Sequence, residues 1–187
     1  MLPIIIVLAD GFSDWEIAPL AGLGRSFYGA RIDFTSPQGG PLTSAAGLKI
    51  AATTRFQAAN EGVVVVCGGP EFETNVSPEL VEELCASFEN GCAIAGICGG
   101  TIALASAELL NDVAHTSNGP GYLEGYVCNY AGAAHYVDQP KALRDGNIIT
   151  APAPAIGSFA VEVLIAAGLE AETAGQIMAM LAREHGI

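Results

Sequence analysis

The sequence has few charged residues and very little positive charge. Charged side chains make up 14% of its 187 residues, and 7 lysines and arginines face 20 aspartates and glutamates, for a formal net charge of −13. Nucleic acids and anionic membrane surfaces are bound by clustered positive charge, so neither is an expected partner. Because 51% of the residues are hydrophobic, the low charge indicates a compact globular protein rather than a disordered one.

Long apolar runs and a basic amino-terminal segment are also missing. No stretch approaches the roughly 18 apolar residues that span a bilayer. The apolar run that starts at Pro3 ends before Asp10 and has no basic residue ahead of it, which predicts a first strand rather than a signal peptide. We therefore expect a cytoplasmic protein whose residues 1–187 form a single domain.

Paired cysteines are absent as well. The five cysteines are an odd number and form no C-x-x-C pair, which argues against a disulfide framework and a zinc site and fits a reducing cytoplasm. His115, His135 and His185 have no ligand spacing with the cysteines, so no metal ion is expected.

Apolar, β-branched runs alternate with helical patterns along the chain. This alternation predicts an α/β fold with a doubly wound, mostly parallel sheet and helices on both faces. The expected strands are 3–9, 31–36, 62–67, 92–97, 113–117, and the pair 134–137 and 147–150 joined across Gly146, with a small hairpin in 43–54. The expected helices are 15–27 with a distorted first turn or a kink at Pro19, 78–90 capped by Ser77, 101–110, a short one within 118–130, 158–167 capped by Ser158, and 172–185.

The main chemical signal is the segment Gly96-Ile97-Cys98-Gly99-Gly100, which lies between an apolar strand and a helical pattern. A reactive-type residue at a tight strand-to-helix turn with small neighbours is a nucleophile elbow. Amides at the start of the helix favour a thiolate and can hold an oxyanion. The alternative is a buried core cysteine, although the flanking glycines would only weaken a plain core segment.

Three features in order resemble the ThiJ/PfpI superfamily, which has the class I glutamine amidotransferase-like fold. They are Glu16 after the first strand, the Gly68-Gly69 turn after the valine strand, and the elbow at Cys98. The resemblance covers nearly the whole chain and implies a flavodoxin-like sandwich, often a homodimer, with a reactive cysteine at the elbow. It implies no cofactor.

The resemblance also assigns roles to individual residues. Glu16 matches a first-helix glutamate that contacts the elbow thiol, where a protonated carboxyl can stabilise a thiolate and move protons. The amides of Gly69 and Gly99 match the oxyanion donors. The alternative for Glu16 is a carboxylate that interacts with the helix dipole. Cys67, beside the Gly-Gly turn, either lies near the site or fills the core.

The sequence departs from the superfamily pattern at Asn118, where many catalytic members have a histidine. An asparagine can orient a substrate but cannot act as a general base. His115 lies three residues earlier, so strand geometry would direct it to the opposite face. We interpret His115 as a packed or edge histidine.

Two specific branches of the superfamily fit less well. Glutamine amidotransferases have a late His-x-Glu pattern, whereas His185 is followed only by Gly186 and Ile187, so a glutaminase is not expected. Isonitrile hydratases have aspartate in place of Glu16, which counts against that substrate.

The sequence therefore predicts a cysteine-dependent enzyme acting on a small carbonyl or other electrophilic substrate by hydrolase, hydratase or lyase chemistry. Cys98 would be the nucleophile, Glu16 would tune it, Gly69 and Gly99 would hold an oxyanion, and Asn118 would orient the substrate. The alternatives are an oxidative-stress sensor in which Cys98 is oxidised to sulfinic acid, and a small-molecule binding module.

Overall fold

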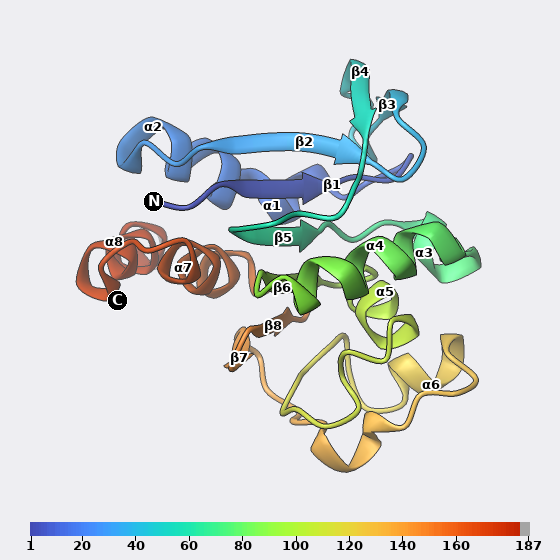
Figure 1. Ribbon diagram of the computed structural model, residues 1–187. Helices are drawn as coiled ribbons and strands as arrows, with labels where there is room; N and C mark the ends of the chain where they lie inside the picture. Colours follow the sequence, from blue (N-terminus) through green and yellow to red (C-terminus); the bar gives the residue numbers. More distant parts are fainter. Residues whose placement is uncertain (184–187) are drawn as a thin grey trace.

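The computed structural model describes residues 1–183, and an eight-stranded sheet forms its centre (Figure 1). The strand order is β3-β4-β2-β1-β5-β6-β8-β7. The inner strands β4, β2, β1, β5, β6 and β8 run parallel to one another, and the edge strands β3 and β7 are antiparallel to their neighbours. The strands are β1 (Ile4–Val7), β2 (Ile32–Ser36), β3 (Gly40–Thr43), β4 (Lys49–Arg55), β5 (Val63–Val66), β6 (Ala93–Ile97), β7 (Leu143–Asp145) and β8 (Ile148–Ala151).

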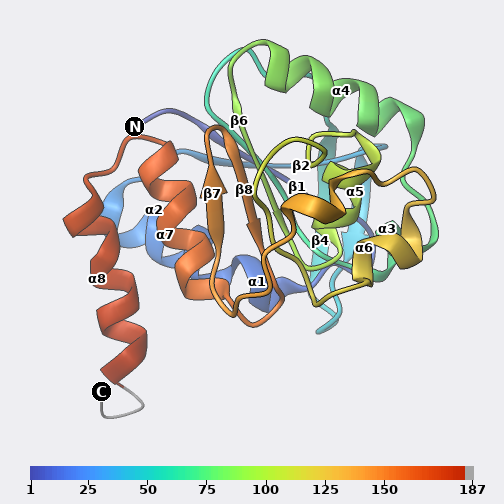
Figure 2. The same cartoon turned by 90° about the horizontal axis from the view of Figure 1, so that it is seen from below.

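Helices cover both faces of this sheet (Figure 2). One face carries α1 (Asp14–Ala18), the π-helical segment η1 (Pro19–Leu23), α2 (Gly24–Tyr28), α7 (Ile156–Ala166) and α8 (Ala171–Ala182). The other carries α3 (Pro70–Thr74), α4 (Pro78–Glu89), α5 (Gly100–Ser106) and α6 (Tyr122–Tyr126), with a 3-10 turn η2 (Gly132–His135) beyond them. The predicted doubly wound, flavodoxin-like architecture is confirmed.

Each face of the sheet has its own apolar core. Alternate residues of a strand point to opposite faces, so Ile6 and Val65 pack with Phe159 of α7, while Val64 packs with Leu104 of α5. All four valines of β5 are buried, as the continuous β-branched run predicted. None of the helices within residues 1–183 is both long and apolar enough to cross a membrane.

The strand register brings three segments to one edge of the sheet. β5 pairs with β6 from Val63↔Ala93 to Val66↔Gly96, and β1 pairs with β5 on its other side. The residues that follow these parallel strands therefore meet at the carboxyl edge, where open α/β sheets bind ligands. They are the turn into α1, the Gly68-Gly69 turn and Cys98.

The first helical segment is irregular at Pro19, where the sequence predicted a distorted first turn or a kink. α1, η1 and α2 follow one another without a break, and the π-helical segment begins at Pro19 itself. Proline lacks an N–H and clashes with the preceding turn, so the ordinary helical hydrogen-bond pattern cannot continue through it.

The structure corrects the predictions for residues 113–158. Residues 113–117 form no strand and contribute only an isolated bridge between His115 and Tyr136. Residues 134–137 do not pair with β8. The antiparallel partner of β8 is β7, because a two-residue loop at Gly146 joins β7 and β8 in a tight hairpin. Ser158 lies inside α7 rather than capping it, and its hydroxyl donates to the Ala155 carbonyl at 3.1 Å.

Other boundaries differ less. α5 ends at Ser106, earlier than predicted, and α3 was not predicted at all. α4 starts as expected, with the Ser77 side chain accepting a hydrogen bond from the Leu80 N–H. α8 ends at Ala182, and His185 lies outside the described residues.

Candidate active site

Cys98 occupies a strained strand-to-helix turn between β6 and α5. Its φ of 54° is in the left-handed region, which few non-glycine residues adopt. A Cβ on Gly100 would lie 2.2 Å from the Val66 carbonyl oxygen, so α5 approaches β5 too closely for any side chain there. The predicted nucleophile elbow is therefore formed, with backbone strain of the kind found at functional sites.

Glu16 is fully buried beside this turn. The side chain comes from α1, and Oε2 accepts a hydrogen bond of 2.9 Å from the Gly68 N–H. Oε1 is buried and, among residues 1–183, has no hydrogen-bond partner with ordinary geometry. A buried carboxylate is poorly solvated, and this desolvation raises the pKa of Glu16 to about 7.

The Cys98 thiol and the Glu16 carboxyl interact directly enough to shift each other's protonation. Burial, followed by the charge of Glu16, raises the pKa of Cys98 to about 11, whereas the thiol lowers the pKa of Glu16. The expectation of a thiolate stabilised by the helix start is wrong for the resting site, because burial and a neighbouring carboxylate outweigh the Gly99 amide. Above pH about 7 the pair instead carries one negative charge, on Glu16, beside one thiol proton on Cys98.

Asn118 contacts Cys98 from another side. Its Nδ2 donates to Cys98 Sγ at 3.2 Å, and its Oδ1 accepts from the Ala153 N–H at 3.0 Å. The backbone donor at Ala153 fixes which end of the amide faces sulfur. The amide hydrogen bond lowers the pKa of Cys98, against the larger effect of burial.

His115 is packed away from the thiol, as interpreted from the sequence. It is fully buried, its Nδ1 donates to the Val113 carbonyl at 2.8 Å, and its Nε2 bonds to the Tyr130 hydroxyl. Burial lowers the pKa of His115 and favours the neutral ring. Both ring nitrogens are occupied, so this histidine is not a base for Cys98.

The Gly68-Gly69 turn and the elbow pack backbone against backbone. A Cβ on Gly99 would lie 2.9 Å from the Gly69 oxygen, and one on Gly68 would lie 2.4 Å from Glu16 Oε2 and 2.8 Å from Cys98 Cβ. The structure thus brings all five predicted residues, Cys98, Glu16, Gly69, Gly99 and Asn118, to one place. The narrow fit explains why glycines occupy these turns.

Two further side chains, Cys67 and Tyr122, are affected by the charge of Cys98. Cys67 is buried, its Sγ donates to the Ser13 carbonyl at 3.5 Å, and burial, followed by the charges of Glu16 and Cys98, raises its pKa. Tyr122 donates to Glu73 Oε1 at 2.9 Å. Neither Tyr122 nor Glu73 was predicted, because no signal in the sequence links two residues that lie 49 positions apart.

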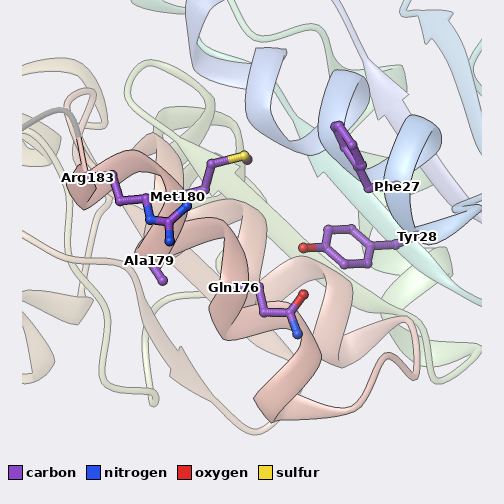
Figure 3. A pocket seen from close by; sticks show the side chains of 6 residues that line it. All are labelled: Phe27, Tyr28, Gln176, Ala179, Met180 and Arg183. Atoms are coloured by element: carbon purple, nitrogen blue, oxygen red, sulfur yellow. The ribbon is translucent and has the colours of Figure 1, made fainter.

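A cavity of about 360 Å³ adjoins Asn118; its lining is Ser117, Asn118, Gly119, Asp138, Gln139, Pro140, Pro152 and Pro154. A second cavity, of about 430 Å³, lies between α2 and α8, where Tyr28 faces Gln176 and Met180 (Figure 3). None of its lining residues belongs to the predicted site. Within residues 1–183, no cluster of histidine, cysteine, aspartate and glutamate side chains is placed to hold a metal ion.

Comparisons with known proteins agree with this arrangement. The DJ-1 superfamily protein Atu0886 from Agrobacterium tumefaciens is 36% identical over 99% of this chain and all of its own, with a TM-score of 0.89. A ThiJ/PfpI family protein from Bacillus anthracis is 26% identical over 87% of this chain and 81% of its own, with a TM-score of 0.77.

A curated relative, named the uncharacterized protease YoaZ of Bacillus subtilis (strain 168), is 33% identical over 105 residues. That match covers 56% of this chain and only half the length of the relative. The model of the DJ-1/PfpI family matches residues 3–166. With the elbow cysteine, the buried glutamate and the eight-stranded sheet in place, the chain belongs to the DJ-1/PfpI family.

Proposed function

We propose that this protein is a cysteine-dependent enzyme that acts on a small carbonyl or other electrophilic substrate. The observation that carries the proposal is the position of Cys98 Sγ, at a strained elbow between the buried carboxyl of Glu16 and the amide of Asn118. Nucleophile, base and polar orienting group within reach of one another are what covalent catalysis requires.

The protonation states suggest how the nucleophile is activated. Above pH about 7, Glu16 is a carboxylate beside a thiol. As sulfur attacks the electrophilic carbon, the thiol proton moves to Glu16, a C–S bond forms, and the carbonyl π electrons move onto oxygen. Protonated Glu16 then returns its proton to that oxygen or to a leaving group.

The two glycine turns complete the proposed site. The Gly69 and Gly99 amides would hold the developing oxyanion, and Asn118 would orient the substrate or a water molecule. Hydrolysis, hydration and bond cleavage all begin with this adduct. The Bacillus subtilis relative's name includes the word protease, so peptide and ester carbonyls belong among the candidate substrates. The single domain, the homodimer and the cytoplasmic compartment stay predictions.

Turnover of a panel of electrophiles tests the proposal. Small aldehydes, 2-oxoaldehydes, esters, nitriles and short peptides are offered to the wild type, Cys98→Ser and Cys98→Ala. We expect turnover of at least one class, reduced by about 1000-fold or more in both variants. Peroxide-dependent oxidation of Cys98 without turnover of any class would contradict an enzyme and support the sensor.

A further inference from the structure

The segment that carries Asn118 lies beside α5 and β8 (Figure 1). Residues 113–117 form no strand and contribute only an isolated bridge, so the hydrogen bonds of the sheet do not fix the direction of the Asn118 side chain. Side chains hold the segment instead. The first of these contacts joins it to β8, where the Thr116 N–H donates to the Thr150 hydroxyl oxygen at 2.8 Å.

Thr101 and Ser117 form a pair of buried hydroxyl groups beside the elbow. Oγ1 of Thr101, on α5, donates to the Cys98 carbonyl oxygen at 2.6 Å and lies 2.7 Å from Ser117 Oγ. A hydroxyl has one hydrogen, and a carbonyl oxygen can only accept. Both contacts are therefore hydrogen bonds in one order only, in which Ser117 donates to Thr101 and Thr101 donates to the Cys98 carbonyl.

Asn118 directly follows Ser117 and returns to the same cysteine. Its Nδ2 donates to Cys98 Sγ at 3.2 Å, and its Oδ1 accepts from the Ala153 N–H at 3.0 Å. Cys98 is thus held at its carbonyl by Thr101 and at its sulfur by Asn118. Ser117 joins these two contacts, because it bonds to Thr101 and is the chain neighbour of Asn118. The closed ring of contacts sets the distance between the amide and the thiol.

We propose that Thr101 and Ser117 are positioning residues that hold the Asn118 amide against Cys98 Sγ. The inference rests on the proposed function of Cys98, whose developing anion the amide would stabilise. Both hydroxyls bond to neutral groups, so their effect on the sulfur goes through the geometry of the ring.

The titratable side chains around Cys98 stay unchanged when either hydroxyl is removed. They are Glu16 from α1, Cys67 after β5 and Tyr122 from α6. A change in the reactivity of the thiol would therefore come from the placement of the Asn118 amide and not from a lost charge. Because the amide hydrogen bond lowers the pKa of Cys98, a weaker bond shifts reactivity to higher pH.

The pH profile of Cys98 alkylation by iodoacetamide tests this role. Asn118→Ala is expected to raise the midpoint of the profile by about one pH unit, because the donor to the anionic pair of Cys98 and Glu16 is lost. Ser117→Ala and Thr101→Val leave the amide present but loosely held, and each is expected to raise the midpoint by about half a pH unit. Thr101→Ser keeps the hydroxyl and should retain the wild-type midpoint.

Two comparisons separate positioning from structural support. A double variant, Ser117→Ala with Asn118→Ala, should match Asn118→Ala alone, because Ser117 acts through Asn118. Ser87→Ala is the matched control, since Ser87 of α4 is also a buried hydroxyl with two hydrogen bonds, one donated to the Glu83 carbonyl at 2.6 Å and one accepted from the Ala59 N–H at 3.0 Å. This control should lower the free energy of unfolding and leave the alkylation profile unchanged.

A wild-type midpoint in Ser117→Ala, or an effect that adds fully to that of Asn118→Ala, would overturn the inference. Ser117→Ala leaves the Thr101 bond to the elbow intact, so it carries the test even if Thr101→Val does not fold. Absence of turnover of every electrophile would instead overturn the proposed function and leave the alkylation midpoints readable. The two failures are therefore distinguishable.

Discussion

Replacing Glu16 with glutamine is expected to stabilise the fold at pH 8 by about 2–3 kcal/mol. The wild-type carboxylate is fully buried, and its pKa rises from an ordinary 4.5 to about 7 on folding. Glutamine keeps an oxygen for the Gly68 N–H, which Glu16 Oε2 accepts at 2.9 Å, but it never ionises. The substitution therefore removes the cost of a buried charge without removing the hydrogen bond.

The pH dependence of this effect has a defined window. Below pH 4.5 the carboxyl is protonated in both the folded and the unfolded chain, so Glu16 adds no pH dependence. Between 4.5 and about 7 the unfolded chain releases the proton while the folded chain holds it, so the wild type loses stability as pH rises. Above pH about 7 the wild type has lost this part of its stability completely, and the loss no longer changes with pH.

Urea unfolding of both proteins at pH 4, 5.5, 7 and 8 measures this difference, with Glu82→Gln on the exposed side of α4 as control. The gap between Glu16→Gln and the wild type should open from pH 4 to pH 7, and Glu82→Gln should follow the wild type. A gap that does not vary with pH would mean that Glu16 is not a destabilising buried carboxylate.

Replacing Gly100 with alanine is expected to lower the free energy of unfolding by about 3 kcal/mol or more, or to prevent folding. The new Cβ would lie 2.2 Å from the carbonyl oxygen and 2.9 Å from the carbonyl carbon of Val66. These are backbone atoms of a central strand and cannot rotate away. Relief requires α5 to move off β5, which would also displace Cys98.

Gly125→Ala is the matched control for this prediction. Gly125 lies in α6, and a Cβ there would meet no atom within 4 Å among the described residues. Alanine in a helix is favoured over glycine by about 0.5–1 kcal/mol, so this variant should be slightly more stable. If Gly100→Ala has the same free energy of unfolding as the wild type in denaturant, this would contradict the close contact between Gly100 and the Val66 backbone.

The layers of the fold could be predicted because each signal was local. The four valines of β5, the Ser77-Pro78 helix start and the proline inside the first helical segment each fix one element by its own chemistry. Residues 113–137 could not be placed in the same way, since their conformation depends on tertiary contacts. His115 is held by Tyr130 and Tyr136 through ring packing and one hydrogen bond. The hydrophobic periodicity of the sequence does not indicate contacts of this kind.

The residues of the site could also be selected from the sequence, but their protonation could not. The glycines around Cys98 indicate the elbow, and the resemblance to the ThiJ/PfpI superfamily implied that Glu16, Gly69 and Asn118 meet it. Whether the thiol is acidic depends on burial and on the distance to Glu16, which the sequence does not contain. The Gly99 amide at the start of α5 favours the thiolate, but burial and the charge of Glu16 have the larger, opposite effect on the pKa of Cys98.

The pH dependence of Cys98 alkylation by iodoacetamide, read by mass spectrometry in the wild type, Glu16→Gln and Glu16→Leu, tests the central claim most directly. If Glu16 takes the thiol proton, the wild-type rate rises with a midpoint near 7, where Glu16 ionises. Both variants lose that step and react only as the thiol itself ionises at higher pH. One shared profile for all three proteins, or a Cys98 that never reacts in the folded state, would contradict a nucleophile activated by Glu16.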